Sequence, residues 1–353
     1  MLRIVGLRWR TPGEPLPNLS RMKHFALILA LGGASVAVSA ASQPKTTDKE
    51  PLRLESSIDA MGSSYSMVLY GTDAAVLQSA AEEAAEEARR LDHMLSNYIP
   101  TSEWSEVNRD AASRPVRVSP ELFQLLTDCV NYSRESDGAF DISVGPLMKV
   151  WGFYKGTGRL PHRAEIRGAL AGVGYNNIVL DPAARTVRFA RPAVELDPGG
   201  IGKGYAVDRM VEVLRKDGIT ASLVSASGSS IYAMGAPPSE PRGWKIGIKN
   251  PKKPTHTIED VYLKDESMST SGNYEKFFYA EGRMWSHIMD PRTGYPAEGI
   301  LSVSVIAPRT LDSEAWAKPF YVNGRQWAAT HKPKAFRVFV CEDKKETSCA
   351  WLP

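Results

Sequence analysis

Candidate helices and strands follow one another along this chain without the regular strand–helix–strand alternation that builds a parallel sheet. Apolar residues recur three or four positions apart over 77–95, which predicts an amphipathic helix. A second helix is expected to begin at Ser119-Pro120, because a first turn tolerates proline. A third is expected to cover 205–216 and to end at Gly218. Short apolar runs predict strands over 66–70, 221–225, 301–306 and 336–340.

This irregular mixture favours an α+β fold, with mixed or antiparallel sheets and packed helices, over a doubly wound parallel sheet. In 301–306 apolar residues alternate with Ser302 and Ser304, so one face of that strand is polar. The 353 residues are enough for one large domain, or for two modest lobes, with a sizeable core. A net charge of +3 is small for this length and gives no reason to expect a nucleic-acid surface.

The N-terminal part of the chain has the features of a segment that directs export. A basic start at 22–24 precedes an apolar run over 25–40, which ends in the small residues of 38–40. That order is typical of a secretory signal, and the run is too short and too interrupted by glycine to span a bilayer well. An uncleaved membrane anchor is the alternative interpretation. Export would place the protein in the periplasm or another extracytoplasmic compartment.

These features divide the chain into four parts. We expect a non-native start extension (1–21), a signal peptide (22–40), a polar linker (41–50) and one folded domain (51–353).

The three cysteines suggest one disulfide and one core residue. Cys341 and Cys349 lie close together near the C-terminus, and in an exported protein they could form a disulfide that holds the tail. Two free thiols are the alternative. Cys129 falls on the apolar face of a predicted helix, so we expect it in the core.

Four segments have residue types that favour chemistry. The first runs over 136–141 and leads to the aromatic stretch 151–153. Glycine followed by Ala139, Phe140 and Asp141 offers a tight backbone, an aromatic wall and a carboxylate, which suits a ring with polar edges. A surface turn with Phe140 in the core is the alternative.

The second segment is the glycine-rich loop 197–204, directly before the helix predicted at 205–216. Glycines let backbone amides approach an anion, and a helix N-terminus and Lys203 add positive charge. The loop therefore predicts a diphosphate site. Its glycine spacing matches neither a Walker A loop nor a dinucleotide fingerprint. A tight strand-to-helix connection is the alternative.

The third and fourth segments supply groups for proton transfer and metal binding. His287, Asp290 and Arg292 lie among turn residues and offer a proton carrier and anion contacts. Asp312 and Glu314 could provide oxygen ligands for Mg²⁺. A charged helix start, which carboxylates also favour, is the alternative for this pair.

Together and in this order, these segments resemble the ApbE family of FAD:protein FMN transferases. The resemblance runs from about Met61 to about Lys318. Its most specific parts are Gly138-Ala139-Phe140-Asp141, the loop 197–204 with Tyr205-Ala206-Val207-Asp208, Ser269-Thr270-Ser271-Gly272, and 287–294.

The resemblance implies a two-lobed fold with FAD in the cleft between the lobes. It implies that the chain uses Mg²⁺ and attaches the FMN half of FAD to a Thr or Ser hydroxyl of a flavoprotein, with release of AMP. Acceptors of this kind belong to membrane or periplasmic electron-transfer systems.

By motif position, the implied FAD contacts are Met61, Tyr98, Ala139, Phe140, Asp141, Asp197, Lys203 and His287. The backbone at Gly200 and the side chain of Glu314 are the implied metal contacts. The acceptor hydroxyl needs a base, for which His287 and Asp290 are both candidates.

Two departures from the family pattern concern the metal. The last motif of the family has an Asp and, four residues later, a Thr as oxygen ligands, and this chain has Glu314 and Lys318 there. Glutamate can still bind Mg²⁺, whereas an ammonium group has three donors and no acceptor. The second departure is Gly228-Ser229-Ser230, where the family often has paired glycines before an acidic or amide residue. We therefore expect a weakened or altered Mg²⁺ dependence.

Two other functions stay open. One is an FAD-binding protein that does not catalyse transfer, which Lys318 motivates. The other is a pyrophosphatase that uses water to split FAD into FMN and AMP. A Rossmann oxidoreductase is disfavoured, because no segment has its fingerprint.

Overall fold

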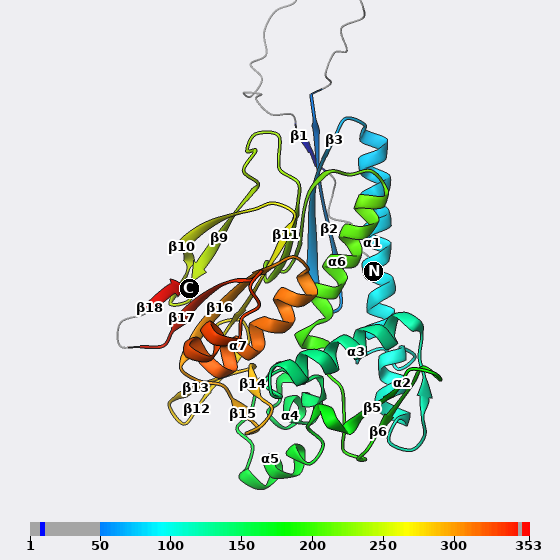
Figure 1. The fold of residues 1–353 in the computed structure, drawn as a ribbon, viewed down its shortest axis with the longest axis vertical. Helices are drawn as coiled ribbons and strands as arrows, with labels where there is room; N and C mark the ends of the chain where they lie inside the picture. Colours follow the sequence, from blue (N-terminus) through cyan, green and yellow to red (C-terminus); the bar gives the residue numbers. More distant parts are fainter. Residues whose placement is uncertain (1–7, 11–49, 345–347) are drawn as a thin grey trace, which may run out of the picture.

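A computed structural model describes residues 8–10, 50–344 and 348–353 and confirms the α+β prediction (Figure 1). The predicted signal peptide and nearly all of the predicted linker and start extension lie outside the described residues. Within them, no helix is both long and apolar enough to cross a bilayer.

Nine strands form one large sheet in the order β1-β2-β3-β7-β8-β11-β16-β17-β18. Every neighbouring pair in it is antiparallel. Its strands are β1 (Arg8–Arg10), β2 (Leu52–Ala60), β3 (Ser63–Gly71), β7 (Ala221–Ala226), β8 (Ser230–Met234), β11 (Glu266–Gly272), β16 (Ile300–Ala307), β17 (Arg337–Glu342) and β18 (Ser348–Trp351).

Smaller sheets and the helices complete the fold. The remaining strands are β4 (Val116–Arg117), β5 (Ile178–Asp181), β6 (Thr186–Phe189), β9 (Trp244–Asn250), β10 (Lys253–Leu263), β12 (Phe277–Ala280), β13 (Arg283–Ser286), β14 (Met289–Asp290) and β15 (Tyr295–Pro296). The α-helices are α1 (Ala74–Leu95), α2 (Glu103–Asp110), α3 (Pro120–Glu135), α4 (Gly145–Val150), α5 (Arg163–Leu170), α6 (Gly202–Lys216) and α7 (Thr310–His331). Short 3₁₀ turns include η1 (Ile142–Val144) and η4 (Pro198–Gly200).

The three predicted helices and four predicted strands are all confirmed, in α1, α3, α6, β3, β7, β16 and β17, and β17 begins one residue after its predicted start at 336. Their ends follow the expected signals. Ser119 caps α3 with Pro120 in its first turn, and Gly218 follows α6 with a φ of 79°. Glycine adopts this left-handed conformation without steric cost.

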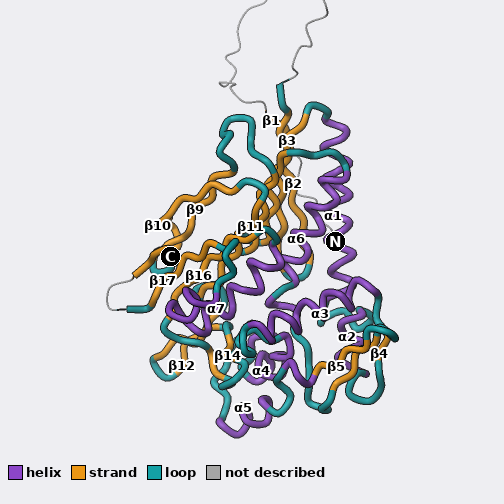
Figure 2. Tube along the Cα trace, in the orientation of Figure 1, coloured by secondary structure: helices purple, strands orange, loops and turns teal. Residues whose placement is uncertain are grey.

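Two lobes are visible in Figure 2. In the larger lobe, α1, α6 and α7 cover one face of the nine-stranded sheet, and the hairpin β9–β10 packs on the other. The smaller lobe contains α2 to α5 with the sheet β4-β6-β5. A separate apolar cluster that includes Trp151 and Trp285 joins α4 and α5 to the hairpin β12–β13.

The strand β16 differs from its expected environment. Its serines do face one side, but that side is covered, since Ser302 and Ser304 are 2% and 1% exposed. Ser304 Oγ lies 2.8 Å from Thr270 Oγ1 of the neighbouring strand. Because β16 lies between two strands and both sheet faces are covered, neither serine faces water, and Ser304 bonds inside the protein.

The predicted disulfide between Cys341 and Cys349 is confirmed, and the two residues are opposite one another on β17 and β18. Cys129 is fully buried, also as predicted. Replacing Cys341 and Cys349 together by serine is expected to lower the free energy of unfolding by about 2–3 kcal/mol, because the disulfide restricts the unfolded chain. The loss is modest because the loop that the disulfide closes is short. Urea unfolding of both proteins measures this difference. Equal transition midpoints would contradict it.

Candidate functional site

The site is built around the N-terminus of α6 and the turn that precedes it. Asp197 accepts a hydrogen bond from Gly199 N at 2.8 Å and so fixes the turn η4. The first amides of a helix have no acceptor within the helix. Those of Gly202 and Lys203 therefore give this end of α6 a positive potential.

Lys203 places its ammonium group beside the next turn of the sheet. Its Nζ donates a hydrogen bond of 2.5 Å to Ser229 Oγ, in the turn between β7 and β8. Met61 lies at the turn between β2 and β3, and its Sδ is 4.0 Å from the position that a Cβ at Gly202 would take. The structure thus brings Met61, Lys203 and the unusual Ser229 together.

The predicted aromatic wall lies against the same turn. Phe140 is 3% exposed and packs edge-on against Tyr132. Its ring comes within 3.4 Å of the position that a Cβ at Gly200 would take. Phe140 therefore lies beside η4, and most of its surface belongs to the core. Ala139, next to it, is 1% exposed.

Asp141 has a structural role. Its carboxylate accepts hydrogen bonds from Ser143 N at 2.8 Å, Ser143 Oγ at 2.6 Å and Tyr175 N at 2.6 Å. Burial raises the pKa of Asp141, although these three bonds oppose the rise. The carboxylate caps η1 and ties it to the segment after α5.

Tyr154 lies between Tyr98 and Asp197 and contacts both. Tyr98 is 74% exposed, and its ring meets that of Tyr154 edge-on with centroids 6.4 Å apart. Asp197 is 7% exposed, and its pKa is raised by burial, against hydrogen bonds from Tyr154 and the Gly199 amide. An exposed tyrosine beside a buried carboxylate provides a surface on which a ring could pack.

His287 follows β13 directly and is half-buried. Its Nδ1 lies 3.1 Å from the carbonyl oxygen of Lys276. Because a carbonyl only accepts, this contact places the proton on Nδ1 and leaves Nε2 as a base. Burial, followed by the charges of Lys276, Lys203 and Lys318, lowers the pKa of His287 to about 4.

Asp290, the other candidate base, is paired with a cation. Arg292 donates to its carboxylate from Nε at 2.9 Å, from a terminal guanidinium nitrogen at 3.1 Å and from its backbone amide at 3.0 Å. The same guanidinium donates to Asn323 Oδ1. Arg292 therefore occupies both oxygens of this carboxylate, which leaves it poorly placed to receive a proton from another group.

The start of α7 is anchored on α6. Asp208, within α6, accepts hydrogen bonds from Thr310 N at 2.7 Å and Leu311 N at 2.8 Å. Burial raises the pKa of Asp208 to about 6, against these bonds. Asp208, the last residue of the motif 205–208, therefore caps the N-terminus of α7. It also fixes where the later residues of α7 lie.

The two acidic residues at the start of α7 have different environments. Asp312 pairs with Arg309 and accepts a hydrogen bond from Tyr132, which fits the expected alternative of a charged helix start. Glu314 is 2% exposed, and its Oε2 accepts a hydrogen bond from Gly204 N. A Cβ at Gly204 would lie 2.6 Å from Thr310 O, so only glycine fits this close approach.

Lys318 lies one turn after Glu314 on α7. Its Nζ donates to Glu314 O at 2.9 Å and is 3.8 Å from Glu314 Oε1. Burial and the charge of Lys203 lower the pKa of Lys318 to about 8, whereas Glu314 acts to raise it. At neutral pH the group is still mostly protonated.

The sequence did not single out Tyr154 and Lys276. Tyr154 directly follows the aromatic stretch 151–153, and Lys276 lies two residues after Tyr274 of the third segment. Tyr154 reaches the site through Tyr98, 56 positions earlier in the chain, and Lys276 through its carbonyl contact with His287, 11 positions later. Residue type and spacing carried no signal for either. Their chain neighbours were the only available indication.

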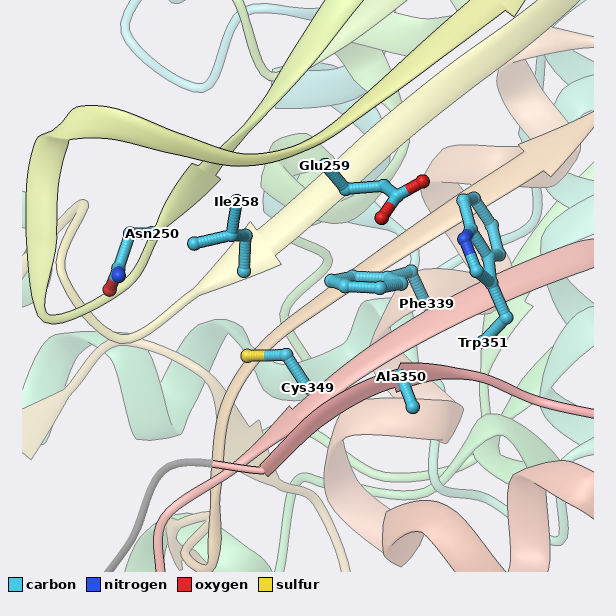
Figure 3. Close-up of a pocket in the computed structure, with 7 residues that line it drawn as sticks. All are labelled: Asn250, Ile258, Glu259, Phe339, Cys349, Ala350 and Trp351. Atoms are coloured by element: carbon cyan, nitrogen blue, oxygen red, sulfur yellow. The ribbon is translucent and has the colours of Figure 1, made fainter.

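A separate groove on the molecule shares no residue with this site. It has a volume of about 410 Å³ and lies between the hairpin β9–β10 and the edge strand β18 (Figure 3). Its lining consists of Asn250, Ile258, Glu259, Phe339, Cys349, Ala350 and Trp351. With one acid and no cation, this lining is unsuited to a diphosphate.

The chain is similar to proteins of one known family. The model of the ApbE family matches residues 61–338. The FAD:protein FMN transferase of Klebsiella pneumoniae is 34% identical over 260 residues, covering 72% of this chain and 78% of that protein. The FAD:protein FMN transferase of Salmonella typhimurium is 28% identical over 344 residues, covering 93% and 95%.

A solved structure agrees with the sequence comparison. The crystal structure of the ApbE protein from Thermotoga maritima superposes with a TM-score of 0.77 at 30% identity, covering 84% of this chain and 96% of that chain. The family match extends over most of the domain and includes every segment that surrounds the α6 N-terminus. This chain belongs to the ApbE family.

Proposed function

We propose that the protein transfers the FMN half of FAD to a Thr or Ser hydroxyl of another protein and releases AMP. The observation that carries the proposal is the amide end of α6 with the Lys203 ammonium group beside it. His287 lies in the same region, and its pKa is lowered by burial and, to a smaller extent, by the charges of Lys276, Lys203 and Lys318. A cation and helix amides suit a diphosphate, and a neutral imidazole suits a hydroxyl that must lose its proton.

The proposed reaction is one displacement at phosphorus. The acceptor oxygen forms a bond to the phosphorus of the FMN phosphate, and the bond from that phosphorus to the oxygen bridging to AMP breaks. AMP leaves with the electron pair, and the hydroxyl proton goes to a base. The protein contributes by positioning the groups and by stabilising negative charge on the phosphate oxygens.

His287 is the base that we favour over Asp290. Its Nδ1 contact with the Lys276 carbonyl leaves Nε2 free to accept a proton, whereas Arg292 occupies the carboxylate of Asp290. The negative charge of a bound diphosphate would offset the positive charges of the nearby lysines and so raise the pKa of His287 in the complex.

The lowered pKa of His287 predicts a specific pH profile. A base acts when deprotonated, so kcat/KM should stay nearly constant from about pH 7.5 to about pH 5.5 and fall only as the pH approaches about 4. Initial rates with limiting FAD measure this, with circular dichroism at each pH to confirm that the protein stays folded. Half-maximal kcat/KM near about pH 6.5 would indicate a histidine with an ordinary pKa and contradict the expectation.

The magnesium requirement is proposed to be weakened or altered. Glu314 remains as the acidic residue of the family metal site, but Lys318 replaces the neutral oxygen ligand. A cation adjacent to a carboxylate competes with Mg²⁺ for it.

The proposed partner is a flavoprotein subunit of a membrane or periplasmic electron-transfer system, and the proposed location is outside the cytoplasm. The sequence features of 22–40 support this location. The proposed binding region for FAD is the space between the lobes, where residues of both meet at η4.

AMP release distinguishes the proposal from its alternatives. The purified protein is incubated with FAD, with and without an acceptor that carries the target threonine. A transferase releases AMP only with the acceptor. Equal release in both reactions would instead identify a pyrophosphatase, and retention of intact FAD would identify a binding protein.

A further inference from the structure

Glu314 and Lys318 form a compact pair that faces the phosphate-binding end of α6. Glu314 is 2% exposed, and one of its oxygens is already bonded to Gly204 N. The Lys318 side chain is 23% exposed, and its Nζ is held by the carbonyl oxygen of Glu314 at 2.9 Å. They are four positions apart, so both extend from the same side of α7.

Lys318 also reaches the turn η4. Its Cε lies 3.8 Å from the position that a Cβ at Gly200 would take. Gly200 is the residue whose backbone the family resemblance marks as a metal contact. The end of the Lys318 side chain therefore lies between the two implied metal contacts, Gly200 and Glu314.

The residues present do not fit a divalent cation at this place. Mg²⁺ requires close to octahedral coordination by oxygen atoms. Among residues 50–344 and 348–353, no group of three or more His, Cys, Asp or Glu side chains gathers where it could hold an ion. Glu314 alone is available, and the ammonium groups of Lys318 and Lys203 would repel a metal ion beside it.

We infer that the ammonium group of Lys318 takes the place of a divalent cation and, with Lys203, binds the diphosphate of FAD. This inference rests on the proposed function for the identity of the ligand. Glu314 then serves as a partner that holds Lys318 and caps α6, and no metal ligand is required. Lys318 is a binding residue of this chain that the common family pattern lacks.

The inference predicts that FAD binds equally well without magnesium. Affinity is measured by quenching of flavin fluorescence, in EDTA and in millimolar Mg²⁺. For the unaltered protein the two dissociation constants should agree within about twofold. In EDTA, Lys318→Thr should weaken binding about tenfold or more, since a charge-assisted contact is lost. Lys318→Arg should restore most of the affinity.

The control is Lys334→Thr, which removes the same charge from an exposed position beyond α7. It should bind FAD like the unaltered protein. Tenfold tighter binding of the unaltered protein in Mg²⁺ would overturn the inference, as would unchanged affinity of Lys318→Thr in EDTA. If that variant does not fold, Lys318→Gln and the comparison of the unaltered protein with and without Mg²⁺ still decide the matter.

This test is separate from the test of transfer. If FAD binds without magnesium but no FMN reaches an acceptor, the proposed function fails and the role of Lys318 stands. If transfer occurs but FAD binding requires Mg²⁺, the role of Lys318 fails and the proposed function stands.

Discussion

His287→Ala is expected to lower the rate of FMN transfer by about 10²–10⁴-fold, the range for loss of a general base. The imidazole is the group whose free nitrogen can accept the hydroxyl proton, because its Nδ1 faces the carbonyl of Lys276. Affinity for FAD should change by less than about tenfold, since Lys203 and the α6 amides remain. Single-turnover rates and fluorescence titration measure the two effects separately.

Asp290→Asn is the matched comparison for this prediction. It removes the other candidate base but keeps the side-chain shape. Because Arg292 already occupies this carboxylate, the fold loss in transfer rate should be at least about ten times smaller than in His287→Ala. An equal or larger loss in Asp290→Asn, with an unchanged unfolding midpoint, would assign the base to Asp290.

Lys203→Met is expected to weaken FAD binding by about 10–100-fold, in line with the about 1.5–3 kcal/mol of a hydrogen bond to a charged group. Its Nζ is held by Ser229 Oγ at 2.5 Å beside the N-terminus of α6. Methionine keeps the approximate length of the side chain and removes its charge, so the loss of FAD affinity measures the contribution of the ammonium group. Titration with FAD measures it.

Lys216→Met is the matched control for Lys203→Met. It lies on the same helix, at the exposed C-terminal end, and removes the same charge. Its affinity for FAD should stay within about twofold of the unaltered protein, because charges in solvent are screened over this distance. Similar losses in both variants would mean that net charge, and not a specific contact, governs FAD binding.

Local patterns predicted much of the fold. The helical periodicity of 77–95, the Pro120 start of α3 and the Gly218 end of α6 depend on neighbouring residues, and the structure confirms them. The Cys341–Cys349 bond was also predictable, since the pair is close in sequence. Strand order was not predictable, because β3 pairs with the distant β7 and β11 lies between β8 and β16.

The sequence predicted which types of residue form the site, but not how their side chains are arranged. The glycine-rich loop indicated a phosphate site, yet the sequence could not show that Glu314 bonds to Gly204 or that Asp208 caps α7. These contacts join segments about a hundred residues apart. The choice between His287 and Asp290 stayed open for another reason. It depends on local side-chain geometry, namely the contact of His287 Nδ1 with the Lys276 carbonyl and the pairing of Arg292 with Asp290, which residue type does not reveal.

Intact-mass analysis of an acceptor flavoprotein is the most direct measurement of the central claim. The purified chain is incubated with FAD and an acceptor that carries the target threonine, and the acceptor is weighed before and after. Our account predicts that its mass rises by one phosphoester-linked FMN, with one AMP released for each. An acceptor of unchanged mass, with FAD bound to the chain and intact, would contradict it.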